Sequence, residues 1–183
     1  MEGVNWIMGC VTSTCFVVLV NGTPSYFFQD SRGIRQGFPL SLLLFILIIE
    51  SLSLIISDTQ RKGHIRQIHI SQRLSLTHLF FVDDVILFGL AIVEEWHAFK
   101  EALDLFCSAT GMTISREKSS FLYNEVDEDT RRHISVLLPY RMEPIFTGFK
   151  YMGYRLKPLG YRFVDWRWLV EMFEKRINNW TYR

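Results

Sequence analysis

The sequence contains few of the residues that stabilise secreted or zinc-binding proteins. Its three cysteines, Cys10, Cys15 and Cys107, are an odd number, and no two of them have a Cys-x-x-Cys spacing. This pattern argues against a disulfide framework and a zinc site, so we expect reduced, buried thiols. No Lys or Arg precedes the first apolar residues, so the basic start of a signal peptide is missing as well. We therefore expect an intracellular protein of the cytoplasm or nucleus, without a disulfide partner.

A strong net charge is also absent, because 20 Lys and Arg stand against 19 Asp and Glu, a formal charge of +1. Such a chain does not hold nucleic acid by bulk charge alone. Its two parts differ, however: residues 131–183 carry 11 basic and 4 acidic residues, whereas residues 1–130 carry 9 and 15. An acidic part followed by a basic part suits metal chemistry beside a polyanion, and equally two ordinary surfaces.

Only one apolar run, residues 38–56, is long enough to be compared with a membrane span. Pro39 stands at its start, Glu50 and serines interrupt it, and no basic cluster adjoins its beginning. These features favour a core helix that is buried on several sides, with no membrane partner; a membrane span is the alternative. With 49% hydrophobic residues, the 183-residue chain can fill the core of one domain, or of one domain and the start of a second.

Two apolar runs with β-branched and aromatic residues flank a pair of aspartates between Leu74 and Phe88. The pattern predicts two short strands joined by a tight turn that carries Asp83 and Asp84. Two adjacent carboxylates between apolar strands cost free energy unless a cation or hydrogen-bond donors lie close by, which points to a divalent metal. The alternative is an ordinary turn, because Asp is common in turns for structural reasons.

The remaining patterns predict helices mixed with short strands, which is an α+β fold. Asn21-Gly22 between two strand-like runs predicts a hairpin, and the spacing of Ile92, Trp96, Phe99, Leu103 and Phe106 predicts a helix that ends near Gly111. We further expect the following elements: a glycine-containing loop over 31–41, a helix over 127–138, a strand over 149–156 bent at Gly153, and a helix over 166–180.

Four motifs in order carry a resemblance to a known family. They are Arg32-Gly33-Ile34-Arg35-Gln36-Gly37-x-Pro39-Leu40-Ser41, then Phe81-Val82-Asp83-Asp84, then Gly111-Met112-Thr113-Ile114-x-x-x-Lys118-Ser119, and then Tyr151-Met152-Gly153. Together they resemble the reverse transcriptase of a non-LTR (LINE-type) retrotransposon. The resemblance implies the palm, with part of the fingers, of a right-hand polymerase, an antiparallel sheet backed by helices. It assigns residues 1–160 to palm and fingers and 161–183 to the start of a thumb or connection helix.

The resemblance also implies RNA-directed DNA synthesis with two Mg²⁺ ions, an RNA template, a DNA primer and dNTP. By analogy, Asp83 and Asp84 are catalytic metal ligands, and Lys118, otherwise a solvated loop lysine, approaches the triphosphate. The remaining assignments are Arg35, Gln36 and Gly37 at the template and nucleotide pocket, and Tyr151, Met152 and Gly153 at the primer grip.

Departures from the family pattern concern both single residues and a whole motif. Phe38 replaces an aspartate, Leu42 a proline, Val82 an alanine and Ser115 an asparagine. The family places a further catalytic aspartate on a strand upstream of the first hairpin, and this sequence has no matching segment. We therefore expect a fragment truncated at both ends and catalytically incomplete. The alternative is a non-catalytic nucleic-acid-binding remnant of a retroelement.

Overall fold

The computed structural model describes residues 2–13, 15–29, 37, 39–158 and 160–180, so Arg35, Gln36 and Phe38 lie outside the described residues. It confirms an α+β composition. The helices are α1 (Glu2–Thr12), α2 (Pro39–Arg61), α3 (Val93–Thr110), α4 (Glu128–Leu137) and α5 (Arg167–Trp180), with short 3₁₀ turns η1 (Ile145–Thr147) and η2 (Phe163–Trp166). The strands are β1 (Cys15–Phe16), β2 (Leu19–Val20), β3 (Thr23–Pro24), β4 (Phe28–Gln29), β5 (Ile68–Ser71), β6 (Leu74–Leu76), β7 (His78–Phe81), β8 (Asp84–Leu87), β9 (Ser120–Tyr123), β10 (Arg141–Pro144), β11 (Phe149–Tyr151) and β12 (Tyr154–Leu156).

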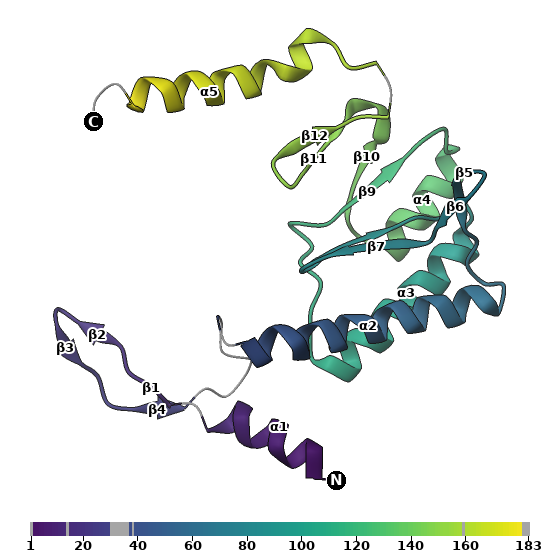
Figure 1. Cartoon of the computed structure of the whole chain (residues 1–183). Coiled ribbons are helices and arrows are strands. Elements are labelled where there is room, and N and C mark those ends of the chain that lie inside the picture. Colours follow the sequence, from purple (N-terminus) through teal and green to yellow (C-terminus); the bar gives the residue numbers. More distant parts are fainter. Residues whose placement is uncertain (1, 14, 30–36, 38, 159, 181–183) are drawn as a thin grey trace.

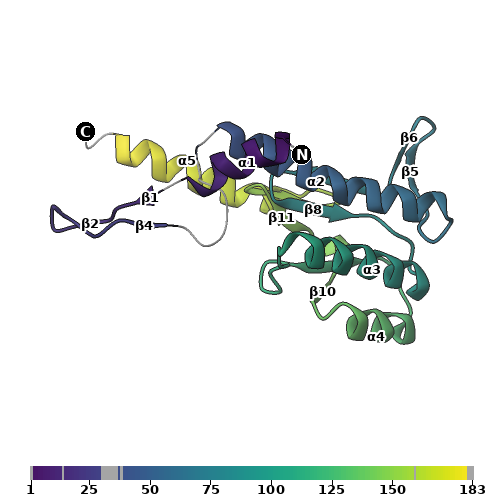
Figure 2. The same cartoon turned by 90° about the horizontal axis from the view of Figure 1, so that it is seen from below.

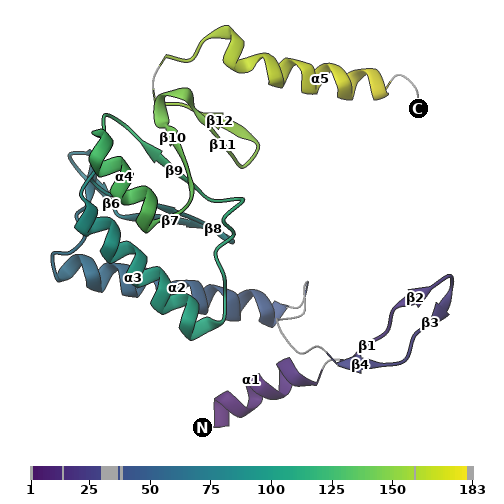
Figure 3. The same cartoon turned by 180° about the vertical axis from the view of Figure 1, so that it is seen from behind.

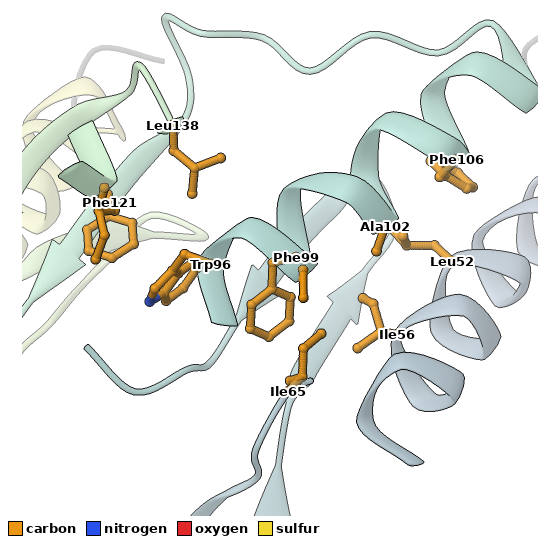
Figure 4. Close-up of a cluster of buried hydrophobic side chains, with 11 residues drawn as sticks. Leu52, Ile56, Ile65, Trp96, Phe99, Ala102, Phe106, Phe121 and Leu138 are labelled. Carbon is orange, nitrogen blue, oxygen red and sulfur yellow. The ribbon is translucent and has the colours of Figure 1, made fainter. Parts of the chain in front are cut away.

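The hydrophobic core lies where α2 and α3 pack against each other (Figures 1 and 4). From α2 only Leu52 and Ile56 are fully buried, and they meet Phe99 of α3, which is 0% exposed. Trp96 extends the core to β9, because its ring packs edge-on against Phe121 with centroids 4.6 Å apart. Helix α4 covers another side of α3. The remaining buried apolar side chains are Ile65, Ala98, Ala102, Phe106, Ile134 and Leu138.

The segment between β8 and α3 is fixed by close contacts with α3. A Cβ on Gly89 would lie 3.1 Å from ring atoms of both Trp96 and Phe99, so a side chain there would displace a core ring. The Trp96 indole N–H donates to the Leu90 carbonyl over 2.8 Å. The buried Glu95 carboxylate accepts from the backbone N–H of Arg66 over 3.1 Å, which ties the chain before β5 to the same helix.

The strands do not form the single antiparallel sheet that the resemblance implied. Within the described part of the chain they form six separate two-stranded sheets, and β9 and β10 run parallel. The reason is the connection: β9 leads into α4 and then into β10, and a helical crossover of this kind returns the chain in the same direction. The prediction is thus confirmed for α+β content and wrong for the continuous antiparallel sheet.

Helix α2 is less buried than its composition predicted. Its apolar side chains Leu42, Leu43, Ile46 and Leu47 are 53–66% exposed, so the expected burial on several sides is wrong for its first half. Among the described residues α2 is the helix that is long and apolar enough to cross a membrane. That is weak evidence for a span, because a core helix can have the same composition.

Two further expectations need correction or refinement. Residues 149–156 form a hairpin, β11 and β12, with Met152-Gly153 as its turn, and not one bent strand. The Cys15 side chain is exposed, against the expectation of a buried thiol, while Cys107 is partly buried. The expected helices that end near Gly111 and that span 127–138 are confirmed, as α3 and α4.

The outer elements stand apart from this body. Figure 1 shows α1 and the β1–β4 hairpin on one side, and α5 running along another. The apolar side chains of α5 that include Val170, Phe173 and Trp180 are 45–86% exposed. The core that supports the candidate site is therefore built from the central part of the chain, α2, α3, β9 and α4.

A leucine pair on α2 tests this core. Leu52→Ala removes a side chain that is 1% exposed, and we expect a loss of about 2–5 kcal/mol in the free energy of unfolding because a cavity remains. Leu54→Ala, on the same helix at 60% exposure, is expected to change it by less than about 0.5 kcal/mol. Urea unfolding followed by circular dichroism measures both; equal losses would contradict this packing.

Candidate functional site

The two aspartates lie on the β7–β8 hairpin. Phe81 pairs with Asp84, so Val82 and Asp83 form a two-residue turn between the strands. Asp83 therefore occupies the turn itself, and Asp84 is the first residue of β8. The predicted hairpin is confirmed.

The turn has an unfavourable residue at its first position. Val82 has φ +53°, in the left-handed region that β-branched residues avoid. Two other two-residue hairpins of the chain have the favoured Gly at the second position, Asn21-Gly22 (φ +52° and +80°) and Met152-Gly153 (φ +50° and +85°). The hairpin that carries the carboxylates thus has a Val where those two have Asn or Met, and an Asp where they have Gly. Local strain of this kind is typical of functional sites, where surrounding structure holds it in place.

Strand alternation gives the hairpin two different faces. Phe80 and Leu87 pack against the core of α2 and α3. On the opposite face the register places Leu79 across from Ile86 and Phe81 across from Asp84. Leu79 and Phe81 are 45% and 50% exposed, so this second face is open. The Asp84 carboxylate therefore points away from the helices, onto an open apolar surface.

Both carboxylates are exposed and available to a ligand. Among the described residues, no Lys, Arg or His forms an ion pair with Asp83 or Asp84, whereas Asp58, Asp104 and Asp165 all have such partners. Two neighbouring oxygen donors without a cation suit Mg²⁺, which binds through one or two carboxylates and keeps water or phosphate as other ligands. No group of three or more His, Cys, Asp or Glu that could hold a metal exists within the described residues.

A polar cluster anchors the start of the hairpin on α2. The Nε2 atom of the His78 ring shares a hydrogen bond with the Ser53 hydroxyl over 3.0 Å, and its Nδ1 atom shares one with the Thr77 hydroxyl over 2.8 Å. Thr77 is 6% exposed. Burial lowers the pKa of His78 below its ordinary value, and the charge of Glu50 partly opposes this shift. The neutral imidazole therefore fixes β7 against α2; the sequence did not single it out, since one His in an apolar run is a weak signal.

Several of the other expected site residues gather at the same end of the molecule as this turn. In the three views of Figures 1, 2 and 3, the start of α2, the α3–β9 loop and the tip of the β11–β12 hairpin lie at that end. Gly37, with φ +81°, comes just before α2, and Lys118 is exposed in the α3–β9 loop. The β11–β12 turn consists of Met152 and Gly153, next to Tyr151. Arg35 and Gln36 lie outside the described residues.

This arrangement of a carboxylate turn, a glycine before a long helix and a basic loop agrees with a family comparison. The model of the family described as reverse transcriptase (RNA-dependent DNA polymerase) matches residues 3–156. The chain belongs to this family.

The comparison with individual proteins gives a more local similarity. An uncharacterized mitochondrial protein of Arabidopsis thaliana is 42% identical over 67 residues, which are 36% of this chain and 55% of that protein. The match thus spans about half the length of that relative. Its name states no activity, so it adds no assignment of individual site residues.

The strained turn leads to a stability prediction. Val82→Asn should raise the free energy of unfolding by roughly 1 kcal/mol, because Asn tolerates the left-handed conformation and Val82, 61% exposed, loses little packing. Val85→Asn, in β8 of the same hairpin, should lower the free energy of unfolding, because it removes a β-branched residue from a regular strand. Urea midpoints test the pair; a Val82→Asn variant as unstable as Val85→Asn would show that the turn is not strained.

The polar cluster leads to a pH prediction. Because the pKa of His78 is lowered in the folded chain, the unfolded chain binds a proton first as the pH falls below about 6.5. Folding stability should therefore decline as the pH falls below about 6.5, before carboxylates begin to titrate. His78→Gln should flatten this decline. Urea midpoints at several pH values measure it; an unchanged decline in His78→Gln would refute the assignment.

Proposed function

We propose that this chain is the metal-binding palm part of a non-LTR (LINE-type) reverse transcriptase, with Asp83 and Asp84 as Mg²⁺ ligands. The proposal rests on the exposed carboxylate pair, which forms no ion pair among the described residues and lies on a strained turn. The reverse transcriptase family model matches the chain that carries it. A bound Mg²⁺ would supply charge stabilisation for the reacting phosphate in nucleotidyl transfer. The hairpin's own contribution is to hold both carboxylates on one rigid turn.

The proposed contacts with substrates come from the segments that lie at the same end of the molecule as the β7–β8 turn. Lys118 approaches the triphosphate of the incoming dNTP, and its exposed ammonium has no acidic partner among the described residues. Tyr151, Met152 and Gly153 steady the primer end from the tip of the β11–β12 hairpin. Arg35, Gln36 and Gly37 contribute to the pocket for the RNA template and nucleotide. Residues 161–183, which include α5, begin the thumb, and the protein acts inside the cell without a membrane.

We further propose that these 183 residues are catalytically incomplete by themselves. A two-metal centre needs carboxylates that hold both ions in line with the reacting oxygens. The β7–β8 turn provides two carboxylates, and no third candidate ligand joins them within the described residues. The chain should therefore bind a divalent ion without rapid primer extension.

A second candidate function is a non-catalytic module that binds nucleic acid. The basic excess of residues 131–183, 11 basic against 4 acidic residues, favours it. In this case binding would fall steeply with salt, and substitution of Asp83 would not reduce it.

Metal binding and primer extension test the main proposal together. Electron paramagnetic resonance of Mn²⁺ should show binding that Asp83→Asn and Asp84→Asn weaken by about tenfold or more, because each removes a ligand oxygen. Asp104→Asn, an exposed aspartate paired with Lys100, should leave it unchanged. Extension of oligo-dT on poly-A with Mg²⁺ should stay near background.

Two outcomes would contradict these proposals. Equal Mn²⁺ affinity in all variants would remove Asp83 and Asp84 as ligands. Rapid extension that Asp83→Asn abolishes would show that the chain is catalytically complete.

A further inference from the structure

A basic ribbon, defined here as residues 61–76, stands apart from the candidate site. It comprises the end of α2, the following connection and the β5–β6 hairpin. Between Arg61 and Arg73 the sequence has four Lys or Arg, two His and no Asp or Glu. In a chain whose net charge is +1, this is a marked local excess of positive charge.

Two of its four cations are already neutralised. Arg61 and Lys62 form ion pairs with Asp58, over 3.3 and 2.7 Å. Arg66 and Arg73 differ, because their exposed guanidinium groups pair with no carboxylate within the described part of the chain. Some exposed arginines elsewhere do have partners, as in Arg132 with Asp129 and Arg141 with Glu143. The ribbon therefore presents two free planar donors that match phosphate oxygens.

The base of the ribbon is held rigidly. Ile65 is 2% exposed in the core, and the next residue, Arg66, donates its backbone N–H to the buried Glu95 carboxylate. The Arg66 side chain remains exposed while its backbone is fixed. A donor fixed in this way loses less conformational entropy when it binds a ligand.

The ribbon also has the shape of a contact surface. β5 and β6 pair only with each other, and Figure 2 shows them projecting from the body beside the end of α2. This end is opposite the β7–β8 turn (Figure 1). Ile70 and Leu74, 56% and 46% exposed, add apolar surface to the ribbon, and Gln67 and Gln72 add polar side chains.

We propose that this ribbon binds the phosphate backbone of a nucleic-acid strand, with Arg66 and Arg73 as the main contacts. The inference rests on the proposed function, since a polymerase-like domain must hold a strand beyond the point of nucleotide addition. It assigns a second nucleic-acid contact at the end of the molecule remote from Asp83 and Asp84.

Salt-dependent binding of the full 183-residue chain tests this proposal. Fluorescence anisotropy would follow binding of labelled single-stranded RNA and DNA of one sequence, each about 20 nucleotides long, over a series of NaCl concentrations. If Arg66→Gln and Arg73→Gln together remove two phosphate contacts, the slope of log K against log salt should fall by about 1.4. Affinity should fall for RNA and DNA if the ribbon reads the backbone alone, and more for RNA if it selects the template strand.

The matched control removes the same charge elsewhere. Lys100→Gln, on α3 and paired with Asp104, lowers the net charge by one, as each single variant Arg66→Gln or Arg73→Gln does, and should leave the salt slope nearly unchanged. An equal loss in Lys100→Gln and in the single ribbon variants would show an effect of bulk charge alone and overturn the proposal. Unchanged binding in the ribbon variant, or no binding by the original chain, would overturn it as well.

Mn²⁺ binding separates this proposal from the proposed function. The ribbon double variant should bind Mn²⁺ as the original chain does, because the ribbon and the β7–β8 turn lie at opposite ends. If the salt test fails while Mn²⁺ still binds and this binding depends on Asp83, only the proposed ribbon site is refuted. Loss of Asp83-dependent binding in the original chain would remove the proposed function.

Discussion

The alternation of side chains along β7 and β8 is the constraint on which the site depends. One face of the hairpin must supply Phe80 and Leu87 to the core, and the opposite face is then free to carry a carboxylate. The core of Leu52, Ile56 and Phe99 stabilises this arrangement, since it holds the hairpin whose turn is intrinsically unfavourable. A turn with an unfavourable backbone conformation needs a rigid support, and α2 with α3 contributes to it.

The parts of the fold that could be read from the sequence are those with local causes. Asn21-Gly22 suits the φ values of a two-residue turn, and Gly111 ends α3 in the left-handed conformation with φ +72°. Asp127 caps α4 because its side chain accepts from the Thr130 backbone N–H over 2.8 Å. The Asp83 hairpin was likewise predictable, because strand periodicity and turn chemistry act within a few residues.

The features that escaped prediction depend on distant contacts. Strand β10, Arg141–Pro144, has no β-branched residue, and it is a strand because its backbone pairs with β9. The exposure of the first half of α2 is not encoded in its apolar composition. The residues around Val82 gave no sign of its positive φ value. The roles expected for Lys118 and Tyr151 rest on the resemblance and not on a local pattern.

The parallel pairing of β9 with β10 also determines the order in which the molecule can assemble. The β7–β8 hairpin closes over two residues and can form within microseconds, whereas β10 must wait until α4 has been made and docked. A ribosome releases the chain from its N-terminus, so α2, β7, β8 and α3 are available before this crossover is complete. During synthesis, the carboxylate turn is therefore in place early, while Phe121 on β9 and then Ile134 on α4 join the core later.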